Sequence, residues 1–134
     1  MFKDRGQELF QQFYMTTVIK GFFKGLHVHP YKHDTIFVPY GKICLAIYTE
    51  PITYEQSQSI SLDINKFEYI ELGHDNPKTI SYPSKYPHGF WGIEDESIII
   101  NYRTPAWTLD DTYQFDITNN NVLNLLTQRY ASMN

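Results

Sequence analysis

Three of the five histidines in this sequence fall within residues 27–33, and Asp34 follows directly. Residues two apart in a β-strand point to the same side, so we expect His27 and His29 to project together. His88 comes about sixty residues later. Imidazole, with an ordinary pKa near ~6.5, can move a proton at neutral pH or bind a metal ion. The pattern therefore predicts proton transfer or metal binding wherever these side chains meet.

A metal site would draw its ligands from His27, His29, Asp34 and His88. Imidazoles with one carboxylate suit Zn, Fe, Ni or Mn, and such a set with open positions would be catalytic. The opposite interpretation is that these side chains line an open mouth and bind nothing. The sequence leaves both the metal site and the unoccupied mouth open. The function predicted below requires no cofactor, and the alternative prediction is one bound divalent metal ion.

Short, closely spaced segments rich in aromatic and branched residues must position the histidines. Aromatic residues make up 16% of the chain, with 11 Tyr and 9 Phe, which favours strands. One helix is expected at 119–130, where apolar residues at helical spacing follow an asparagine cap. The expected strands are 14–19, 26–29, 35–40, 42–49, 59–62, 67–72, 78–82, 88–93 and 97–102.

About eight to ten short strands followed by one helix predict an all-β fold, a barrel or jelly roll. A length of 134 residues suits one hydrophobic core. We therefore expect a single domain over residues 1–134, with the barrel at about 10–107 and the C-terminal helix at about 119–131.

Two motifs resemble those of the cupin family. The first keeps every cupin spacing and reads Gly21-x5-His27-x-His29-x4-Asp34-x6-Gly41. Its one departure is Asp34, where glutamate is usual. The second reads Pro83-x-Lys85-x-x-His88, with a lysine where glycine is usual. The resemblance implies a cupin barrel, which is a double-stranded β-helix of the jelly-roll type.

A narrower resemblance covers about residues 4–107. The segment Lys24-Gly25-Leu26-His27 resembles the Arg-Gly-Leu-His of dTDP-4-dehydrorhamnose 3,5-epimerases, and Pro87-His88-Gly89-Phe90 resembles their Ala-His-Gly-Phe. Asp4-Arg5-Gly6, Gln12 and Thr16 also fall in the family's order. The resemblance implies an isomerase or epimerase that removes a proton beside the ketone of a nucleotide-linked 4-keto-6-deoxy sugar.

The same resemblance implies roles for single residues. His27 takes the place of the family's base, and His88 can donate a hydrogen bond to the oxyanion that forms. Arg5 and Lys24 can hold the diphosphate. Arg5 would do so through bidentate hydrogen bonds from its guanidinium group, and Lys24 as a point charge. The remaining substrate contacts implied are Gln12, His29 and Trp107, the last as a platform for the nucleotide base.

The chain also departs from the family. Trp107 stands where the family has its acidic tyrosine, and indole supplies no acidic proton. Tyr102 is the expected substitute, with Tyr113 and Tyr14 as alternatives. The aspartate that orients the family's base is expected to be missing, and the family's lysine aligns with Asp34. Three outcomes stay open: epimerisation with another phenol, proton transfer along one face as in dTDP-4-keto-6-deoxyhexose 3,4-ketoisomerases, or sugar-nucleotide binding without catalysis.

Composition excludes other classes of function. A net charge of −4 argues against nucleic-acid binding, which needs a basic face. No apolar run is long enough to span a membrane, and the first ten residues lack a signal-peptide core. The single Cys44, expected to be a small buried hydrophobe, excludes an internal disulfide. We therefore expect a cytoplasmic protein, and the family resemblance implies a homodimer.

Overall fold

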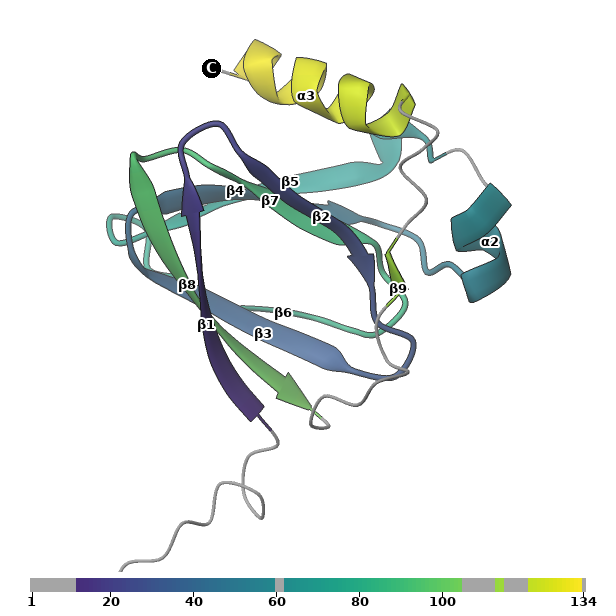
Figure 1. Ribbon diagram of the computed structural model, residues 1–134, viewed down its shortest axis with the longest axis horizontal. Helices are drawn as coiled ribbons and strands as arrows, with labels where there is room; N and C mark the ends of the chain where they lie inside the picture. Colours follow the sequence, from purple (N-terminus) through teal and green to yellow (C-terminus); the bar gives the residue numbers. More distant parts are fainter. Residues whose placement is uncertain (1–11, 60–61, 105–112, 115–120, 134) are drawn as a thin grey trace, which may run out of the picture.

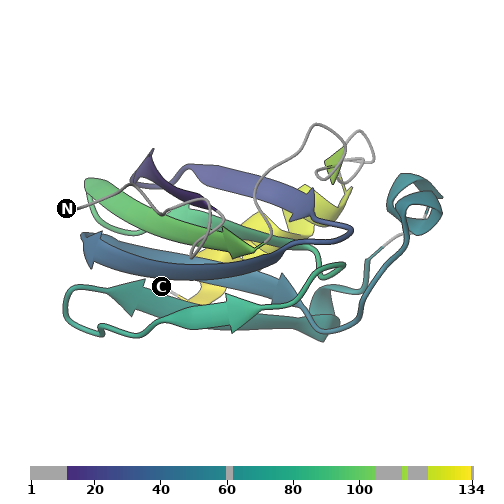
Figure 2. The same cartoon turned by 90° about the horizontal axis from the view of Figure 1, so that it is seen from below.

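Two antiparallel sheets face each other and form a barrel in the computed structural model, which describes residues 12–59, 62–104, 113–114 and 121–133 (Figures 1 and 2). The first sheet has four strands in the order β1-β8-β3-β6. The second has five in the order β5-β4-β7-β2-β9. The expected all-β jelly roll with a C-terminal helix is confirmed.

The bounds of β1 to β8 agree with expected segments to within a few residues, whereas β9 lies where no strand was expected. The first sheet consists of β1 (Gln12–Ile19), β8 (Glu96–Thr104), β3 (His33–Tyr40) and β6 (Ile80–Tyr82). The second consists of β5 (Phe67–Gly73), β4 (Lys42–Tyr48), β7 (His88–Gly92), β2 (Phe23–Val28) and β9 (Tyr113–Gln114).

The helices differ more from expectation. The long helix is α3 (Asn121–Met133), close to the expected 119–131. A short helix, α2 (Tyr54–Ser59), begins in the segment expected as loop and ends where a strand was expected to begin. A 3-10 turn, η1 (Ile64–Lys66), follows it, with the Asp63 carboxylate accepting a hydrogen bond from the Asn65 amide. None of the described helices is long and apolar enough to cross a membrane.

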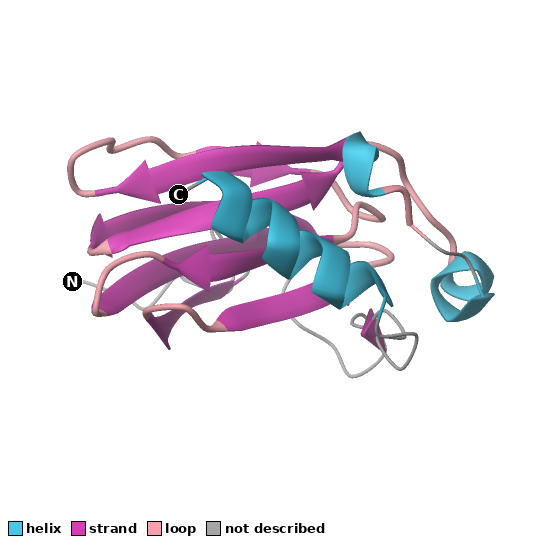
Figure 3. Ribbon diagram, turned by 90° about the horizontal axis from the view of Figure 1, so that it is seen from above, coloured by secondary structure: helices cyan, strands magenta, loops and turns pink. Residues whose placement is uncertain are grey.

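The second sheet is buried on both faces, because α3 crosses its outer side (Figure 3). In β4, Ile43 and Leu45 face the barrel interior, while Cys44 and Ala46 face α3. A strand covered on both sides reads as a continuous apolar run rather than an alternating one. Burial raises the pKa of the Cys44 thiol to about 11, which agrees with its expected role as a small hydrophobe.

Two hydrophobic clusters result from this layering. The cluster inside the barrel consists of Val18, Ile36, Val38, Ile43, Leu45, Leu72, Tyr82 and Ile99. The cluster between the second sheet and α3 consists of Leu26, Val28, Cys44, Ala46, Tyr48, Ile52, Leu62, Phe67, Trp91 and Leu126. The outer face of the first sheet has no such cover in the described part of the chain. It exposes Phe13, Met15, Phe37 and Tyr40.

Docking of α3 predicts a stability effect. Leu126 is fully buried against the second sheet, and replacing it with alanine should lower the free energy of unfolding by about 2–5 kcal/mol. The matched variant Gln128→Ala alters an exposed position of the same helix and should change stability by less than about 0.5 kcal/mol. Urea unfolding measures both; equal effects would show that α3 does not pack as described.

Candidate active site inside the barrel

A β-bulge turns His27 toward the barrel interior. In the pairing of β2 with β7, Gly25 lies opposite Gly89, but His27, not the residue next to Gly25, lies opposite His88. The extra residue is Leu26, which is fully buried beneath α3. Bulges of this kind re-aim a side chain. Because directly opposed residues of antiparallel strands share a face, His27 and His88 point to the same side.

The glycines of the two motifs have a steric reason. Gly25 has a φ of +135°, and a Cβ there would lie 2.7 Å from the Gly89 Cα and 2.8 Å from the His88 carbonyl oxygen. A Cβ on Gly89 would lie 2.7 Å from the Lys24 carbonyl oxygen and against the Phe23 ring. Side chains at either position would therefore push β2 and β7 apart. The motifs that suggested a function also close these strands behind the histidines.

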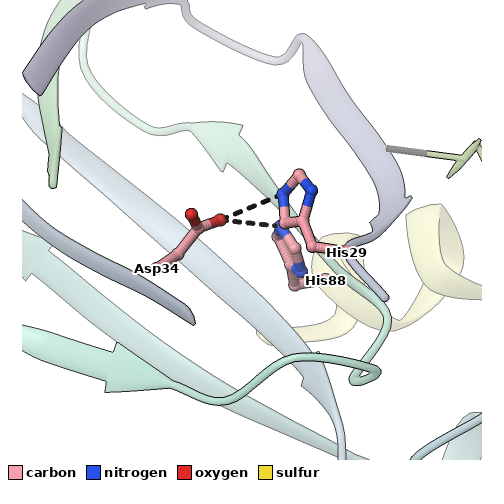
Figure 4. Close-up of side chains that lie close together, drawn as sticks. All are labelled: His29, Asp34 and His88. Atoms are coloured by element: carbon pink, nitrogen blue, oxygen red, sulfur yellow. Dashed lines mark ion pairs between the residues drawn. The ribbon is translucent and has the colours of Figure 1, made fainter. Parts of the chain in front are cut away.

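Asp34 joins two of the histidines from across the barrel (Figure 4). Its Oδ2 atom lies 3.1 Å from the Nε2 of His29 and 3.5 Å from the Nε2 of His88. Asp34 belongs to β3 in the first sheet, whereas His88 belongs to β7 and His29 directly follows β2 in the second. These three side chains are buried, with Asp34 only 1% exposed.

His27 lies at the edge of this group. Its ring centroid is 6.4 Å from that of His88, and the centroids of His29 and His88 are 5.2 Å apart. His27 is half-buried, whereas His29 and His88 are buried. The structure therefore brings His27, His29 and His88 together, with His27 the most accessible of the three.

His88 is neutral at physiological pH. Burial lowers its pKa from 6.5 to about 3, and the neighbouring His29 and His27 act in the same direction, while Asp34 opposes them. The Nδ1 of His88 lies 3.0 Å from the Tyr86 carbonyl oxygen, which can only accept, so Nδ1 carries the proton. Nε2 then holds a lone pair that faces Asp34. In this tautomer the Nε2 of His88 is an acceptor or a ligand, and the role of His88 as donor to an oxyanion stays a prediction from the family resemblance.

The donor atoms of this group have spacings that suit a metal ion. One ligand atom from each of His29, Asp34 and His88 lies within 4.8 Å of the others. Ligand atoms of a tetrahedral site with bonds of about 2.0 Å lie about 3.3 Å apart, and the two distances from Asp34 Oδ2 are 3.1 and 3.5 Å. The Nδ1–H bond of His88 to a backbone carbonyl is also typical of metal-binding histidines. Of the four ligands considered from the sequence, His27 stands outside this group of three.

Two buried residues, Tyr82 and Lys32, were not expected from the sequence, and the first of them contacts this group. Tyr82 in β6 lies opposite Asp34 in the strand pairing, and its ring centroid is 4.5 Å from that of His88. Lys32, two residues before Asp34, is 1% exposed. Tyr82 had no signal in the sequence, because its neighbours depend on the pairing of β6 with β3.

Tyr102, the expected proton donor, lies on the other side of its sheet. Arg103 of β8 is opposite Asp34, so the preceding residue, Tyr102, faces outward. There it lies opposite Thr35, and its ring is 5.2 Å from that of Phe13, which is 56% exposed. The pairing register therefore removes Tyr102 from the group of histidines.

The other expected substrate contacts are only partly described. Lys24 is exposed, and its ammonium donates a hydrogen bond of 3.1 Å to the Thr16 hydroxyl across the gap between β2 and β1. Gln12 begins β1 opposite Arg103, but nothing is described of its side chain. The side chains of Tyr14 and Tyr113, and the whole of Arg5 and Trp107, lie outside the described residues.

Solved structures share this architecture. NovW, a 4-keto-6-deoxy sugar epimerase from Streptomyces spheroides, matches with a TM-score of 0.63 and 13% identity, over 77% of this chain and 50% of its own. The dTDP-4-dehydrorhamnose 3,5-epimerase of Sulfolobus tokodaii matches with 0.61 and 26%, over 77% and 56%. RmlC of Legionella pneumophila, solved with dTDP-4-keto-L-rhamnose, matches with 0.62 and 17%, over 84% and 61%. No protein-family model and no curated protein matches the sequence.

The chain has the cupin fold of these sugar-nucleotide epimerases. It spans between 50% and 61% of the length of the three structures compared. The likeness of the barrels agrees with the resemblance that the motifs around His27 and His88 indicated. What this cupin barrel does is a separate question, which depends on its own interior side chains.

The low pKa of His88 predicts how stability depends on pH. The unfolded state takes up a proton near pH 6.5, but the folded state does so only near pH 3. The unfolded state therefore binds more protons between these values, and the free energy of unfolding should fall as the pH is lowered, by up to about 1.4 kcal/mol per pH unit.

Urea unfolding of metal-free protein between pH 7 and pH 3 measures this effect. The variant His88→Asn should lose this part of the pH dependence, whereas His74→Asn, at an exposed position, should keep it. Parallel curves for the wild type and His88→Asn would show that His88 is not held neutral in the fold.

Proposed function

We propose that this protein is an isomerase or epimerase that acts on a nucleotide-linked 4-keto-6-deoxy sugar. The observation that carries the proposal is the placement of His27 directly opposite His88 on the interior face of a cupin barrel. The fold of several solved sugar-nucleotide epimerases supports it. The Lys24–His27 and Pro87–Phe90 segments support it as well, because they build this part of the barrel.

His27 is the proposed base. A 4-keto group acidifies the hydrogens on the neighbouring carbons, and a neutral imidazole can take one of them at neutral pH. His27 is half-buried, so a substrate can reach it, whereas His29 is buried and in contact with Asp34. Removal of the proton leaves an enolate, and return of a proton to either face completes the reaction.

The negative charge of the enolate needs a donor or a cation, and neutral His88 does not supply one through Nε2. We propose Lys32 for this role. It is a buried ammonium on the segment that leads into Asp34, and fixed positive charge is worth more in a site that excludes water. The Asp34 carboxylate itself is in contact with His29 and His88.

The diphosphate is proposed to bind at the rim of the barrel. Lys24 is exposed and reaches across from β2 to Thr16 on β1, at the gap between the two sheets. A point charge in this position suits a diphosphate. Arg5, Gln12 and Trp107 stay proposed substrate contacts from the family resemblance.

The proposal extends to a homodimer in the cytoplasm. The outer face of the first sheet exposes Phe13, Met15, Phe37 and Tyr40, and apolar groups gathered on one face commonly mark an interaction site. The single cysteine, buried in the fold, is suited to a reducing compartment. These observations support the assignment without identifying the partner surface.

Turnover in D2O tests the function. Wild-type protein mixed with dTDP-4-keto-6-deoxyglucose should incorporate solvent deuterium beside the ketone, as measured by NMR or mass spectrometry. The variant His27→Asn should lower the exchange rate by about 10²–10⁴-fold, because a general base contributes a factor of this size. His33→Asn, at an exposed position outside the group, serves as the control.

Two results would speak against this function. Absence of exchange in folded wild-type protein would exclude proton abstraction; a thermal shift with the same compound would then leave a binding module. Full activity of His27→Asn would instead move the base to another residue.

A metal-dependent cupin enzyme is the second candidate function. The spacing of the ligand atoms of His29, Asp34 and His88 favours it, as does the hydrogen bond that fixes the tautomer of His88. A divalent ion held there would act as a Lewis acid on a substrate oxygen. Two imidazoles and a carboxylate suit Zn, Fe, Ni or Mn.

Metal analysis distinguishes the two candidates without an activity assay. If the metal interpretation holds, protein dialysed against Zn2+ and then against buffer should keep about one ion per chain, His29→Ala should lose it, and His74→Ala should keep it. The same variants can be followed by calorimetric titration with Zn2+ alone. Retention of equal metal by His29→Ala and the wild type would exclude this site.

A further inference from the structure

A hollow lies between β3 and the turn that precedes β6, away from the Asp34 group. It has a volume of about 260 Å³ and is lined by residues 37–39 of β3 and by His74, Pro77, Lys78 and Thr79. Asp34 lies near the start of β3, four residues before the middle of this lining, which corresponds to about 13 Å along a strand. We propose that this hollow, the β3–β6 pocket, binds a small aromatic anion at a site separate from the candidate active site.

The pocket opens where the pairing of β3 with β6 stops. The last pair in the ladder is Ile36 with Ile80. In the same register, residues 37–39 and 77–79 would face each other next, and all six of them line the pocket. The outermost of these facing positions are both prolines, at 39 and 77. Proline has no amide hydrogen and occurs at the ends and edges of sheets, so the ladder does not close over the pocket.

Hydrogen bonds hold the wall that the turn contributes. The amide of His74 donates to the Gly41 carbonyl at 3.2 Å, and the ring Nδ1 of His74 lies 3.2 Å from the same oxygen. The side-chain amide of Asn76 donates to the Glu71 carbonyl at 2.9 Å, and the amide of Lys78 donates to the Asn76 carbonyl at 2.9 Å. Figure 2 shows this turn beside the end of β3. Walls that are fixed in advance reduce the entropy that a ligand loses on binding.

The pocket carries a positive charge that no acid in the described residues neutralises. The ammoniums of Lys42 and Lys66 have carboxylate partners, whereas the exposed Lys78 has none in this part of the chain. The acid of the same turn, Asp75, is the partner of Lys42 at 2.7 Å. The Lys78 ammonium is therefore available to a carboxylate or phosphate, and the Thr79 hydroxyl can donate a hydrogen bond beside it.

The remaining lining favours a ring. Phe37, which is 40% exposed, lines the pocket together with Pro39 and Pro77, and an aromatic ligand can stack or pack edge-on against a phenylalanine ring. A volume of about 260 Å³ is below the range of about 300–1,000 Å³ that drug-sized ligands occupy. One ring with one charged group therefore suits the pocket better than a whole nucleotide sugar.

Phenyl phosphate is the test ligand, because it joins one ring to one phosphate. Titration of 15N-labelled protein, followed by NMR, should give a dissociation constant on the order of 1 mM. The largest shifts should occur at the amides of Val38, Lys78 and Thr79, and those of His27 and His88 should stay in place. Benzyl alcohol, which keeps the ring without the charge, and inorganic phosphate, which keeps the charge without the ring, should each bind at least about tenfold more weakly.

Variants of the lysine test the charge directly. Lys78→Ala should weaken phenyl phosphate binding by about tenfold, because it removes a hydrogen bond to a charged group. Lys78→Glu should weaken it further through repulsion. The matched variant Lys66→Ala removes an exposed lysine of η1, which does not line the pocket, and should bind as tightly as the wild type.

Three results would overturn the proposal. Benzyl alcohol binding as tightly as phenyl phosphate would show that the charge of the pocket plays no part. Equal binding by Lys78→Glu and the wild type would place the anion elsewhere. Shifts confined to His27 and His88 would place it in the candidate active site. The comparison of the three probes uses wild-type protein alone, so it does not depend on the folding of a variant, and no step of the test requires the epimerase function.

Discussion

The interior of this barrel is organised around one buried carboxylate. Asp34 is 1% exposed and touches imidazoles from the opposite sheet through a single oxygen atom, Oδ2. An isolated anion in such a place would cost several kcal/mol, so the groups around it must offset its charge. The contact with His29 does part of this, and it ties β3 to the end of β2. The polar interior is therefore part of the structure that holds the two sheets in register as well as a candidate site.

The apolar layers make this polar centre possible. The second sheet packs on its inner side against the barrel core and on its outer side against α3, so its central strand β4 is largely apolar on both faces. Close approach of Gly25 and Gly89 brings β2 against β7, and the bulge at Leu26 then turns His27 inward. The same residues thus close the barrel wall and set the spacing of the histidines.

The protonation state of His88 decides whether its Nε2 atom donates a hydrogen bond or accepts a proton or a metal ion. Because burial lowers its pKa to about 3 and its Nδ1 proton is held by the Tyr86 carbonyl, its Nε2 lone pair faces Asp34 at 3.5 Å. Two acceptors at this distance attract whatever carries positive charge, either a proton or a metal ion.

The sequence by itself determined eight of the strands described, the C-terminal helix and the shared face of His27 and His29, because these follow from local periodicity and motif spacing. Only the tertiary structure decided which phenol lies inside, since a shift of one residue in strand pairing moves every side chain to the other face. In the observed register, Arg103 pairs with Asp34, so the adjacent Tyr102 faces outward. The pairing of β6 with β3 places Tyr82 beside His88. The neutrality of His88 and the burial of Lys32 likewise depend on packing between strands far apart in the chain, which no local pattern records.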